Sequence, residues 1–289
     1  MAEMPPLKSR TSLRYGNRLF FTEIEARGNA SQDRVDTILR EQPTPGYALV
    51  WADEFDQPDG SPPDPARWNY STGGSGWGNG ELQYYTDDPT NAYIEDGMLV
   101  IKAEQETYMG RDYTSARLNT MVKGTWTYGR FEIRARLPNT QAIWPAFWLL
   151  PMFINNGAWP ASGEIDIMEM IGSEPGRAYG TLHYGNPHEL QSGYYDLPQG
   201  QTFADDFHVF SLEWEPGEFR WYVDGTLYHS ATEWFTSRPN AVYPAPFDQP
   251  FYLILNLAVG GHWPGDPDPT SVFPQFLYVD YVRIYQEQP

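Results

Sequence analysis

Three carboxylic acids, Glu164, Asp166 and Glu169, lie within the otherwise apolar segment ASGEIDIMEMIG at residues 161–172. Successive side chains of a β-strand point to opposite faces, so Glu164 and Asp166 would share one face while the isoleucines occupy the other. Strict alternation would bury Glu169 among the isoleucines, where an unpaired carboxylate is strongly unfavourable. One extra residue, a β-bulge around Ile167–Met168, would return Glu169 to the acidic face. The segment therefore predicts a bulged strand with three acids on one face.

Two carboxyl groups that face a common substrate can together cleave a glycosidic bond. A retaining mechanism needs an ionised nucleophile and a protonated acid about 5–5.5 Å apart, whereas an inverting mechanism separates the groups by about 6.5–9.5 Å. The Cα atoms of Glu164 and Glu169 would lie roughly 13 Å apart at ~3.3 Å per residue, so the side chains must lean together on a concave sheet. Asp166 between them is a negative neighbour that favours a retained proton. The alternative is a solvated strand face without chemistry.

Tryptophans flank the acidic segment at Trp144, Trp148 and Trp159. Indole rings stack on the C–H faces of sugars, so tryptophans beside paired acids indicate a carbohydrate-binding cleft. Trp144 precedes a proline and is therefore expected in extended backbone, exposed in the cleft. Trp148 could line the cleft or belong to the core, and Phe147 is expected in the core.

The glycine-rich stretch at residues 71–88 lacks the lysine of a phosphate-binding loop. Its glycines would form a wall of the cleft, with Asn79 as a substrate contact and Glu81 and Tyr84 as further hydroxyl binders. A purely structural turn is the alternative interpretation of this stretch.

Three further side chains are candidate substrate contacts. His183 is expected on the strand beside the acidic strand, where it could bind substrate, contact an acid or serve only a structural role. Arg117 could hold a carboxylate or a sugar hydroxyl. Trp263, in the loop HWPGDPDP, could border the cleft.

From Tyr47 onward the sequence consists of short alternating or β-branched runs bounded by glycine, proline, asparagine or aspartate. The segment EPGE at 215–218 and the pair Asp224–Gly225 predict two hairpin turns. No helical periodicity extends beyond two turns in this part. The pattern predicts an all-β fold, a jelly-roll sandwich of two antiparallel sheets.

Residues 1–45 differ in composition from the rest, with 7 basic and 6 acidic residues and no tryptophan. Residues 31–42 could form a short helix with Ser31 as its N-cap, and the PTPG segment that follows would end it. We interpret residues 1–45 as an N-terminal extension of unknown role and 46–289 as the principal domain.

The charge balance excludes several kinds of partner. With 38 acidic and 19 basic residues, a net charge of -19, the chain lacks the clustered cations that nucleic acids or anionic membranes require. It has no cysteine and therefore no disulfide or thiolate chemistry. No apolar run approaches the roughly 20 residues of a membrane span, and the N-terminus shows no secretory signal.

Several of these motifs, taken in order, resemble glycoside hydrolase family 16, and specifically its bacterial laminarinase-like endo-β-1,3-glucanases. The resemblance runs from Tyr47 to Gln286 and rests on GWGNGELQYYTDD, TYGRFEIRARLP, WPAFWLLP, GEIDIMEMIG, ADDFHVFSLEW and VDYVRIY. It implies a jelly roll with a long concave cleft and hydrolysis by double displacement with retention. Glu164 would be the nucleophile, Glu169 the general acid/base, and Asp166 a modulator of the pair.

The resemblance also implies that catalysis needs no cofactor. Members of the family often bind a structural calcium ion on the convex face, at positions that match Glu54, Gly97 and Asp280, although these acids could equally be solvated. The expected activity is endo-hydrolysis of β-1,3-glucans. A mixed-linkage β-1,3-1,4-glucanase and a non-catalytic β-glucan-binding domain are the alternatives. We expect a monomer that acts on extracellular polysaccharide.

Overall fold

The computed structural model describes residues 11–15, 18–22 and 46–287. The chain divides into two compact units, Met1–Gly46 and Tyr47–Pro289. In the first unit, β1 (Thr11–Tyr15) and β2 (Arg18–Thr22) pair in antiparallel orientation. The helix predicted at residues 31–42 lies outside the described residues.

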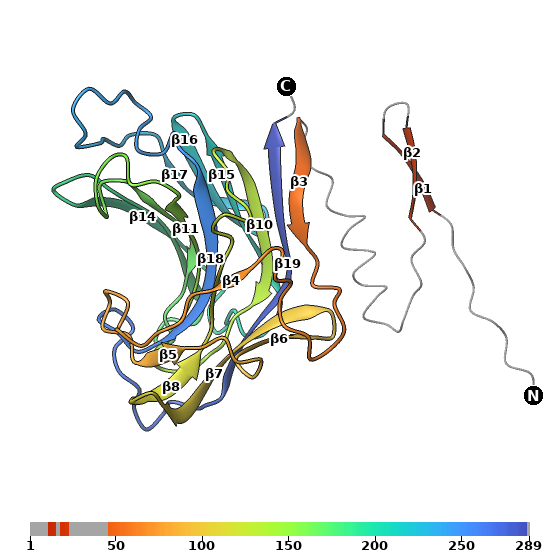
Figure 1. Ribbon diagram of the computed structural model, residues 1–289, viewed down its shortest axis with the longest axis vertical. Helices are drawn as coiled ribbons and strands as arrows, with labels where there is room; N and C mark the ends of the chain where they lie inside the picture. The colour runs from red at the N-terminus through yellow and green to blue at the C-terminus, as the bar shows by residue number, and fades with distance from the viewer. Residues whose placement is uncertain (1–10, 16–17, 23–45, 288–289) are drawn as a thin grey trace, which may run out of the picture. The chain divides into compact units, whose positions relative to one another are not determined.

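The second unit is built from strands, and none of residues 46–287 forms a helix (Figure 1). Its strands are β3 (Tyr47–Asp53), β4 (Asn69–Tyr70), β5 (Gln83–Tyr85), β6 (Ala92–Glu95), β7 (Met98–Tyr108), β8 (Arg111–Ser115), β9 (Arg117–Asn119), β10 (Gly129–Arg136), β11 (Ile143–Pro151), β12 (Glu164–Glu169), β13 (Arg177–Tyr184), β14 (Glu189–Asp196), β15 (His208–Glu215), β16 (Glu218–Val223), β17 (Thr226–Ala231), β18 (Phe251–Val259) and β19 (Gln275–Glu287). No described segment is a helix of the length and apolarity needed to cross a membrane.

These strands form two sheets. The larger sheet has the order β17-β16-β15-β10-β19-β7-β8-β5, with β3 beside β19 and β6 beside β7, and the smaller has the order β14-β13-β12-β11-β18-β9-β4. All described pairings in both sheets are antiparallel except that of β5 with β8, which is parallel. The predicted sandwich of two antiparallel sheets is confirmed apart from that one edge pair.

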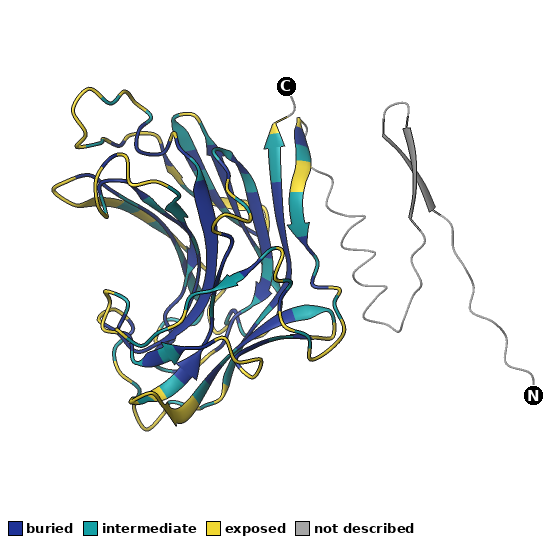
Figure 2. Ribbon diagram, viewed as in Figure 1, coloured by how far each residue is buried: buried dark blue, intermediate teal, exposed yellow. Residues whose placement is uncertain are grey.

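A hydrophobic core fills the space between the two sheets. Phe131 and Ile133 come from β10, Phe147 and Leu149 from β11, and Leu255 from β18, and all five side chains are fully buried. Figure 2 shows buried residues running along the central strands of both layers. Burial of this apolar surface is the main favourable term in folding, and it confirms the prediction that Phe147 belongs to the core.

Both predicted hairpin turns are present. Glu215 pairs with Glu218 across the turn between β15 and β16. Asp224 and Gly225 connect β16 to β17 with φ values of 49° and 75°, the left-handed conformation that a two-residue type I′ turn requires at both central positions.

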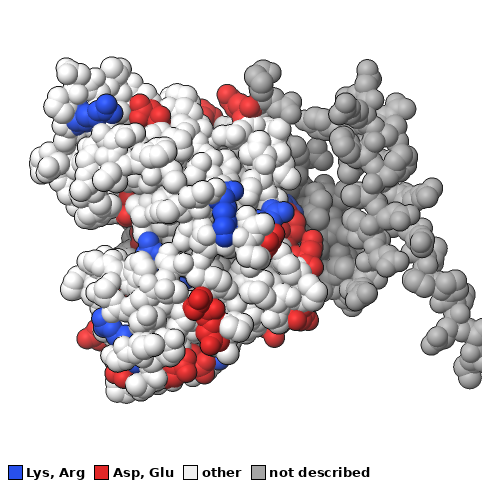
Figure 3. All heavy atoms as spheres, in the orientation of Figure 1, with Lys and Arg blue, Asp and Glu red and all other residues white. Residues whose placement is uncertain are grey.

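The second face of the smaller sheet lines a cleft. Trp148 on β11 lies opposite Asp166 on β12 and opposite Ile254 on β18, so one row of outward side chains crosses three strands. Figure 3 shows the molecule hollowed between two lobes on this side, with sparse and scattered charged groups on the face in view. The sandwich thus presents a concave face, as predicted.

Candidate active site

The acidic strand β12 contains the predicted bulge. Ala146 pairs with Glu169 and Phe147 with Met168, but Trp148 pairs with Asp166, so Ile167 has no opposing residue on β11. Ile167 and Met168 are consecutive, and both are buried towards the core. This double step inward returns Glu169 to the face that carries Glu164 and Asp166. The bulge predicted around Ile167–Met168 is confirmed.

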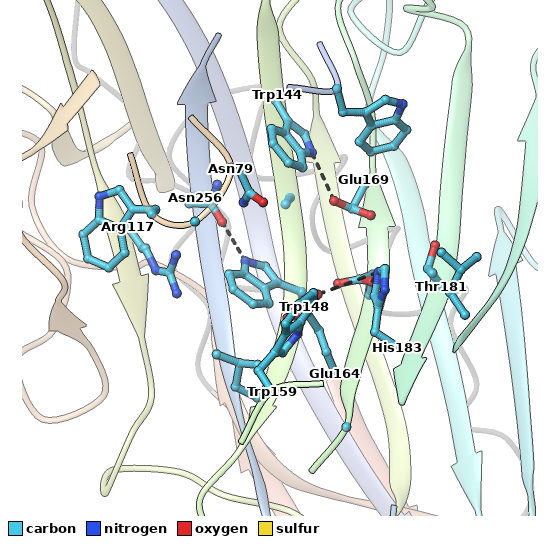
Figure 4. Close-up of a pocket in the computed structure, with 18 of the residues that line it drawn as sticks. Asn79, Arg117, Trp144, Trp148, Trp159, Glu164, Glu169, Thr181, His183 and Asn256 are labelled. Carbon is cyan, nitrogen blue, oxygen red and sulfur yellow. Dashed lines mark hydrogen bonds and ion pairs between the residues drawn. The ribbon is translucent and has the colours of Figure 1, made fainter. Parts of the chain in front are cut away.

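The three acids open into one cavity of about 850 Å³ on the concave face. All the predicted substrate contacts except Tyr84 line the same cavity, although they come from separate segments of the chain. Figure 4 shows several of them around the two glutamates. The predicted residues in its lining are Asn79, Arg117, Trp144, Trp148, Trp159, Glu164, Asp166, Glu169, His183 and Trp263.

Each glutamate accepts a hydrogen bond from an indole N–H. Trp159 donates to Oε2 of Glu164 at 3.0 Å, and Trp144 donates to Oε1 of Glu169 at 3.1 Å. Trp159 is 56% exposed, whereas Trp144 is only 9% exposed. The expected exposure of Trp144 is therefore wrong, because the ring is covered by Trp263 at a centroid distance of 5.5 Å.

His183 lies beside the acids. It pairs with Glu164 across β12 and β13, which confirms its predicted place on the neighbouring strand. Its Nε2 is 3.3 Å from Oδ2 of Asp166 and 3.8 Å from Oε1 of Glu164. Among the described residues, this imidazole is the one positively ionisable group within 4 Å of Glu164 or Asp166.

Burial is the largest influence on the acids and raises the pKa of each of the three carboxyl groups above its ordinary range. The charge of Asp166 further raises the pKa values of Glu164 and Glu169, while His183 and the indole N–H donors lower them. Mutual repulsion of this kind keeps a proton on at least one of the three carboxyl groups at neutral pH, and the nearby hydrogen-bond donors stabilise an ionised carboxylate among them. An acid and an ionised carboxylate can thus coexist in the cleft.

Arg117 is held between two tryptophans. Its guanidinium carbon lies 4.6 Å from the ring centroid of Trp77 and 4.6 Å from that of Trp148. The indole of Trp148 is fixed in turn by a hydrogen bond to Oδ1 of Asn256 at 2.7 Å. Nε of Arg117 is buried and has no hydrogen-bond partner among the described residues. Arg117 lines the cavity, although this nitrogen itself is buried.

The glycine-rich stretch forms part of the cavity wall, as predicted. Asn79 donates to Oε1 of Glu81 at 3.2 Å, and Gln83 donates to Oε2 of the same carboxylate at 2.6 Å. Glu81 is buried, so this network fixes the wall as well as lining the cavity. Tyr84 is absent from the lining and packs against Tyr108 at 5.2 Å, contrary to its expected role as a hydroxyl binder.

Some lining residues were missed at the sequence level. Tyr179 belongs to the outward face of β13 with His183, four residues away, so strand alternation could have identified it. Asn256 is the one strongly polar residue in the apolar run FYLILNLAV, and this isolated polar position could also have indicated a residue of the cavity. Trp77 gave no signal beyond its place in the glycine-rich stretch.

The three positions expected to bind calcium are brought near one another by the sheet register. β3 ends where Asp53 pairs with Val282, and β7 begins near Leu99, which pairs with Val279, so Glu54 and Gly97 both approach the segment around Asp280. The carboxylate of Glu54, however, accepts from Arg283 at 2.8 Å, and that of Asp280 from Arg134 at 2.6 Å. Both carboxylates therefore have guanidinium partners, and calcium binding at these three positions stays a prediction of the resemblance.

A long cleft with indole walls around paired carboxylates is the arrangement of an enzyme that cleaves polysaccharides, and it defines the class as glycoside hydrolase. The family comparison agrees with this class. The sequence profile described as glycosyl hydrolases family 16 matches residues 79–281. The chain belongs to this family.

Individual relatives are also similar over most of the chain. A beta-glucanase of Rhodothermus marinus is 48% identical over 86% of this chain and 88% of the relative. The glucan endo-1,3-beta-glucosidase A1 of Niallia circulans is 41% identical over 98% of this chain but 45% of its own length. The crystal structure of the laminarinase from Rhodothermus marinus superimposes with a TM-score of 0.76 and 47% identity, covering 84% of this chain and 98% of that structure.

Proposed function

We propose that the chain is an endo-acting hydrolase of β-1,3-glucans that retains anomeric configuration. The observation that carries the proposal is the bulge in β12, which places Glu164 and Glu169 in one cleft with an indole donor on each. The laminarinase and endo-1,3-beta-glucosidase names of its relatives support the substrate class. A polysaccharide substrate is expected to be cleaved outside the cell. The monomeric state of the protein stays a prediction.

In the proposed mechanism, Glu164 is the nucleophile. Its carboxylate attacks the anomeric carbon while Glu169 transfers a proton to the departing glycosidic oxygen, which leaves a glycosyl ester on Glu164. Glu169, now ionised, removes a proton from water as the water attacks the same carbon and releases the ester. Charge on Asp166 raises the pKa values of both glutamates and so favours a proton retained on one of them, while Trp159 and His183 favour the ionised form of Glu164. No step requires a cofactor.

Product analysis from a defined β-1,3-glucan oligosaccharide tests this proposal. The expected result is cleavage at internal bonds with initial release of the β-anomer, and faster cleavage of laminarin than of mixed-linkage β-glucan. Faster cleavage of the mixed-linkage polymer would favour the β-1,3-1,4-glucanase alternative. Binding of laminarin without any turnover would favour a non-catalytic glucan-binding domain.

Arg117→Lys should weaken substrate binding more than it slows chemistry. A lysine keeps the charge but loses the planar group that stacks between Trp77 and Trp148. We expect KM for laminarin to rise by about 10-fold, the equivalent of one desolvated cation–π contact, with kcat changed less than KM. Arg67→Lys is the matched control, because Arg67 contacts Trp51 at 5.6 Å and does not line the cavity. An equal effect of both variants would contradict the role of Arg117.

Structural calcium stays a prediction of the family resemblance. If an ion binds near Glu54, Gly97 and Asp280, its removal should lower the Tm by about 5 °C, because a ligand that binds only the folded state stabilises it. Thermal unfolding in EDTA, in calcium and in magnesium measures this effect. A Tm that is the same in all three solutions would contradict calcium binding.

A further inference from the structure

We propose that His188 is a positioning residue of the catalytic cleft: its imidazole holds His183 so that the Nε2 hydrogen of His183 points at Asp166 and Glu164. His188 lies in the four-residue loop between β13 and β14, outside the lining of the cavity. The consequence for catalysis rests on the proposed function, whereas the hydrogen position itself does not.

The two imidazoles are joined directly. Nδ1 of His183 and Nε2 of His188 are 2.9 Å apart, which is hydrogen-bond distance. On its other side, Nε2 of His183 lies 3.3 Å from Oδ2 of Asp166 and 3.8 Å from Oε1 of Glu164. That Oδ2 atom is buried and has no aligned hydrogen-bond partner among the described residues. His183 therefore lies between a histidine and a pair of acids.

The chemistry of neutral imidazole decides where the hydrogens lie. One ring nitrogen carries a hydrogen and the other accepts one. An ionised carboxylate of Asp166 or Glu164 would repel a lone pair on Nε2 of His183, so beside ionised acids Nε2 carries the hydrogen and Nδ1 accepts from Nε2–H of His188. If His183 becomes protonated, Nδ1–H donates and His188 accepts. Because His188 can do both, the hydrogen on Nε2 of His183 is kept in either state.

A tryptophan holds both rings in place. The ring centroid of Trp159 lies 5.1 Å from that of His188 and 6.1 Å from that of His183, and the two imidazole centroids are 5.1 Å apart. The same indole donates to Glu164 at 3.0 Å. These contacts connect the β13–β14 loop to the nucleophile through packed rings, which limits the rotation of each ring.

The titratable groups around the two rings come from three elements. β12 contributes the three acids of the cleft, β14 contributes Glu189 near His188, and β18 contributes Tyr252 near Glu164. Partial burial and the neighbouring His183 lower the pKa of His188, which favours the neutral ring that the hydrogen-bond chain requires.

The hydrogen position is tested by NMR of protein labelled with ¹⁵N in its histidines. At the alkaline end of the titration, where His183 is neutral, we expect its Nε2 to be protonated and its Nδ1 to be unprotonated. In His188→Ala, a second population with hydrogen on Nδ1 should appear. A wild-type His183 with hydrogen on Nδ1, or a tautomer that does not change in the variant, would overturn the proposal. This readout is independent of activity and stands even if laminarin is not the substrate.

The catalytic consequence is tested by the pH dependence of kcat/KM on laminarin. Loss of the oriented N–H makes ionised Glu164 less stable, so His188→Ala should move the acid limb upward by about half a pH unit. His188→Gln should return the acid limb most of the way to its wild-type position, since an amide both donates and accepts. His208→Gln is the control, because His208 pairs with Asp224 in the other sheet. An acid limb that stays in place in His188→Ala would overturn this part, whereas an inactive wild type would overturn the proposed function instead.

Discussion

Glu164→Gln should abolish the hydrolysis of laminarin, with kcat lowered by about 10⁴-fold or more. Glutamine has nearly the shape of glutamate and can keep contact with the indole of Trp159, but its amide cannot form the glycosyl ester that the proposed mechanism requires. Release of reducing ends from laminarin measures the loss. Near-normal activity of this variant would contradict the assignment of Glu164 as the nucleophile.

Stability measurements separate this loss of activity from unfolding. The folded-state pKa of Glu164 is raised from its ordinary value of 4.5 to about 8. Between these two pH values the folded chain therefore binds more protons than the unfolded chain. The free energy of unfolding therefore falls with rising pH over this window. A neutral glutamine removes that term, and we expect Glu164→Gln to unfold at the wild-type temperature or above it at pH 7.

A matched substitution outside the cleft completes the comparison. Glu104 forms an ion pair with Lys102 at 2.5 Å and does not line the cavity. Partly exposed ion pairs of this kind contribute about 1 kcal/mol or less, so Glu104→Gln should keep wild-type activity. A comparable loss in Glu104→Gln would mean that the activity of Glu164→Gln reports general damage.

The sequence predicted those features that depend on local rules. Alternation of apolar and polar residues identified the strands, and turn chemistry at Asp224 identified a hairpin. The bulge in β12 could be predicted because the energetic penalty of burying Glu169 is large and one extra residue relieves it. Each of these inferences needs only neighbours within a few residues.

Features that combine distant segments could not be predicted in the same way. Trp77, Arg117 and Trp148 form one stack from a loop and two strands, and nothing local indicates that the two indoles and the guanidinium meet. The burial of Trp144 depends on a loop more than a hundred residues later in the chain. The contact between His188 and His183 depends on the conformation of a hairpin loop. Strand register and loop conformation, which decide these contacts, are set by the whole fold.

Glu169→Gln should distinguish the general acid from the nucleophile. On laminarin, where the leaving sugar needs a proton, we expect kcat to fall by about 10³-fold or more, within the range that a positioned acid and base supply over two steps. On an aryl β-glucan oligosaccharide with an activated leaving group, the first step needs no proton. The glycosyl ester on Glu164 should then form rapidly and hydrolyse slowly, which gives a burst of released phenol.

The same pair of substrates tests whether the two roles are assigned correctly. Glu164→Gln should be inactive on both, because formation of the ester depends on the carboxylate whatever the leaving group. Added azide should accelerate turnover of the aryl substrate by Glu169→Ala and give a β-glycosyl azide, since azide attacks the ester from the face that water uses. With Glu164→Ala, azide would replace the carboxylate itself and give the α-azide. Exchange of these two products would show that Glu169 is the nucleophile and Glu164 the acid.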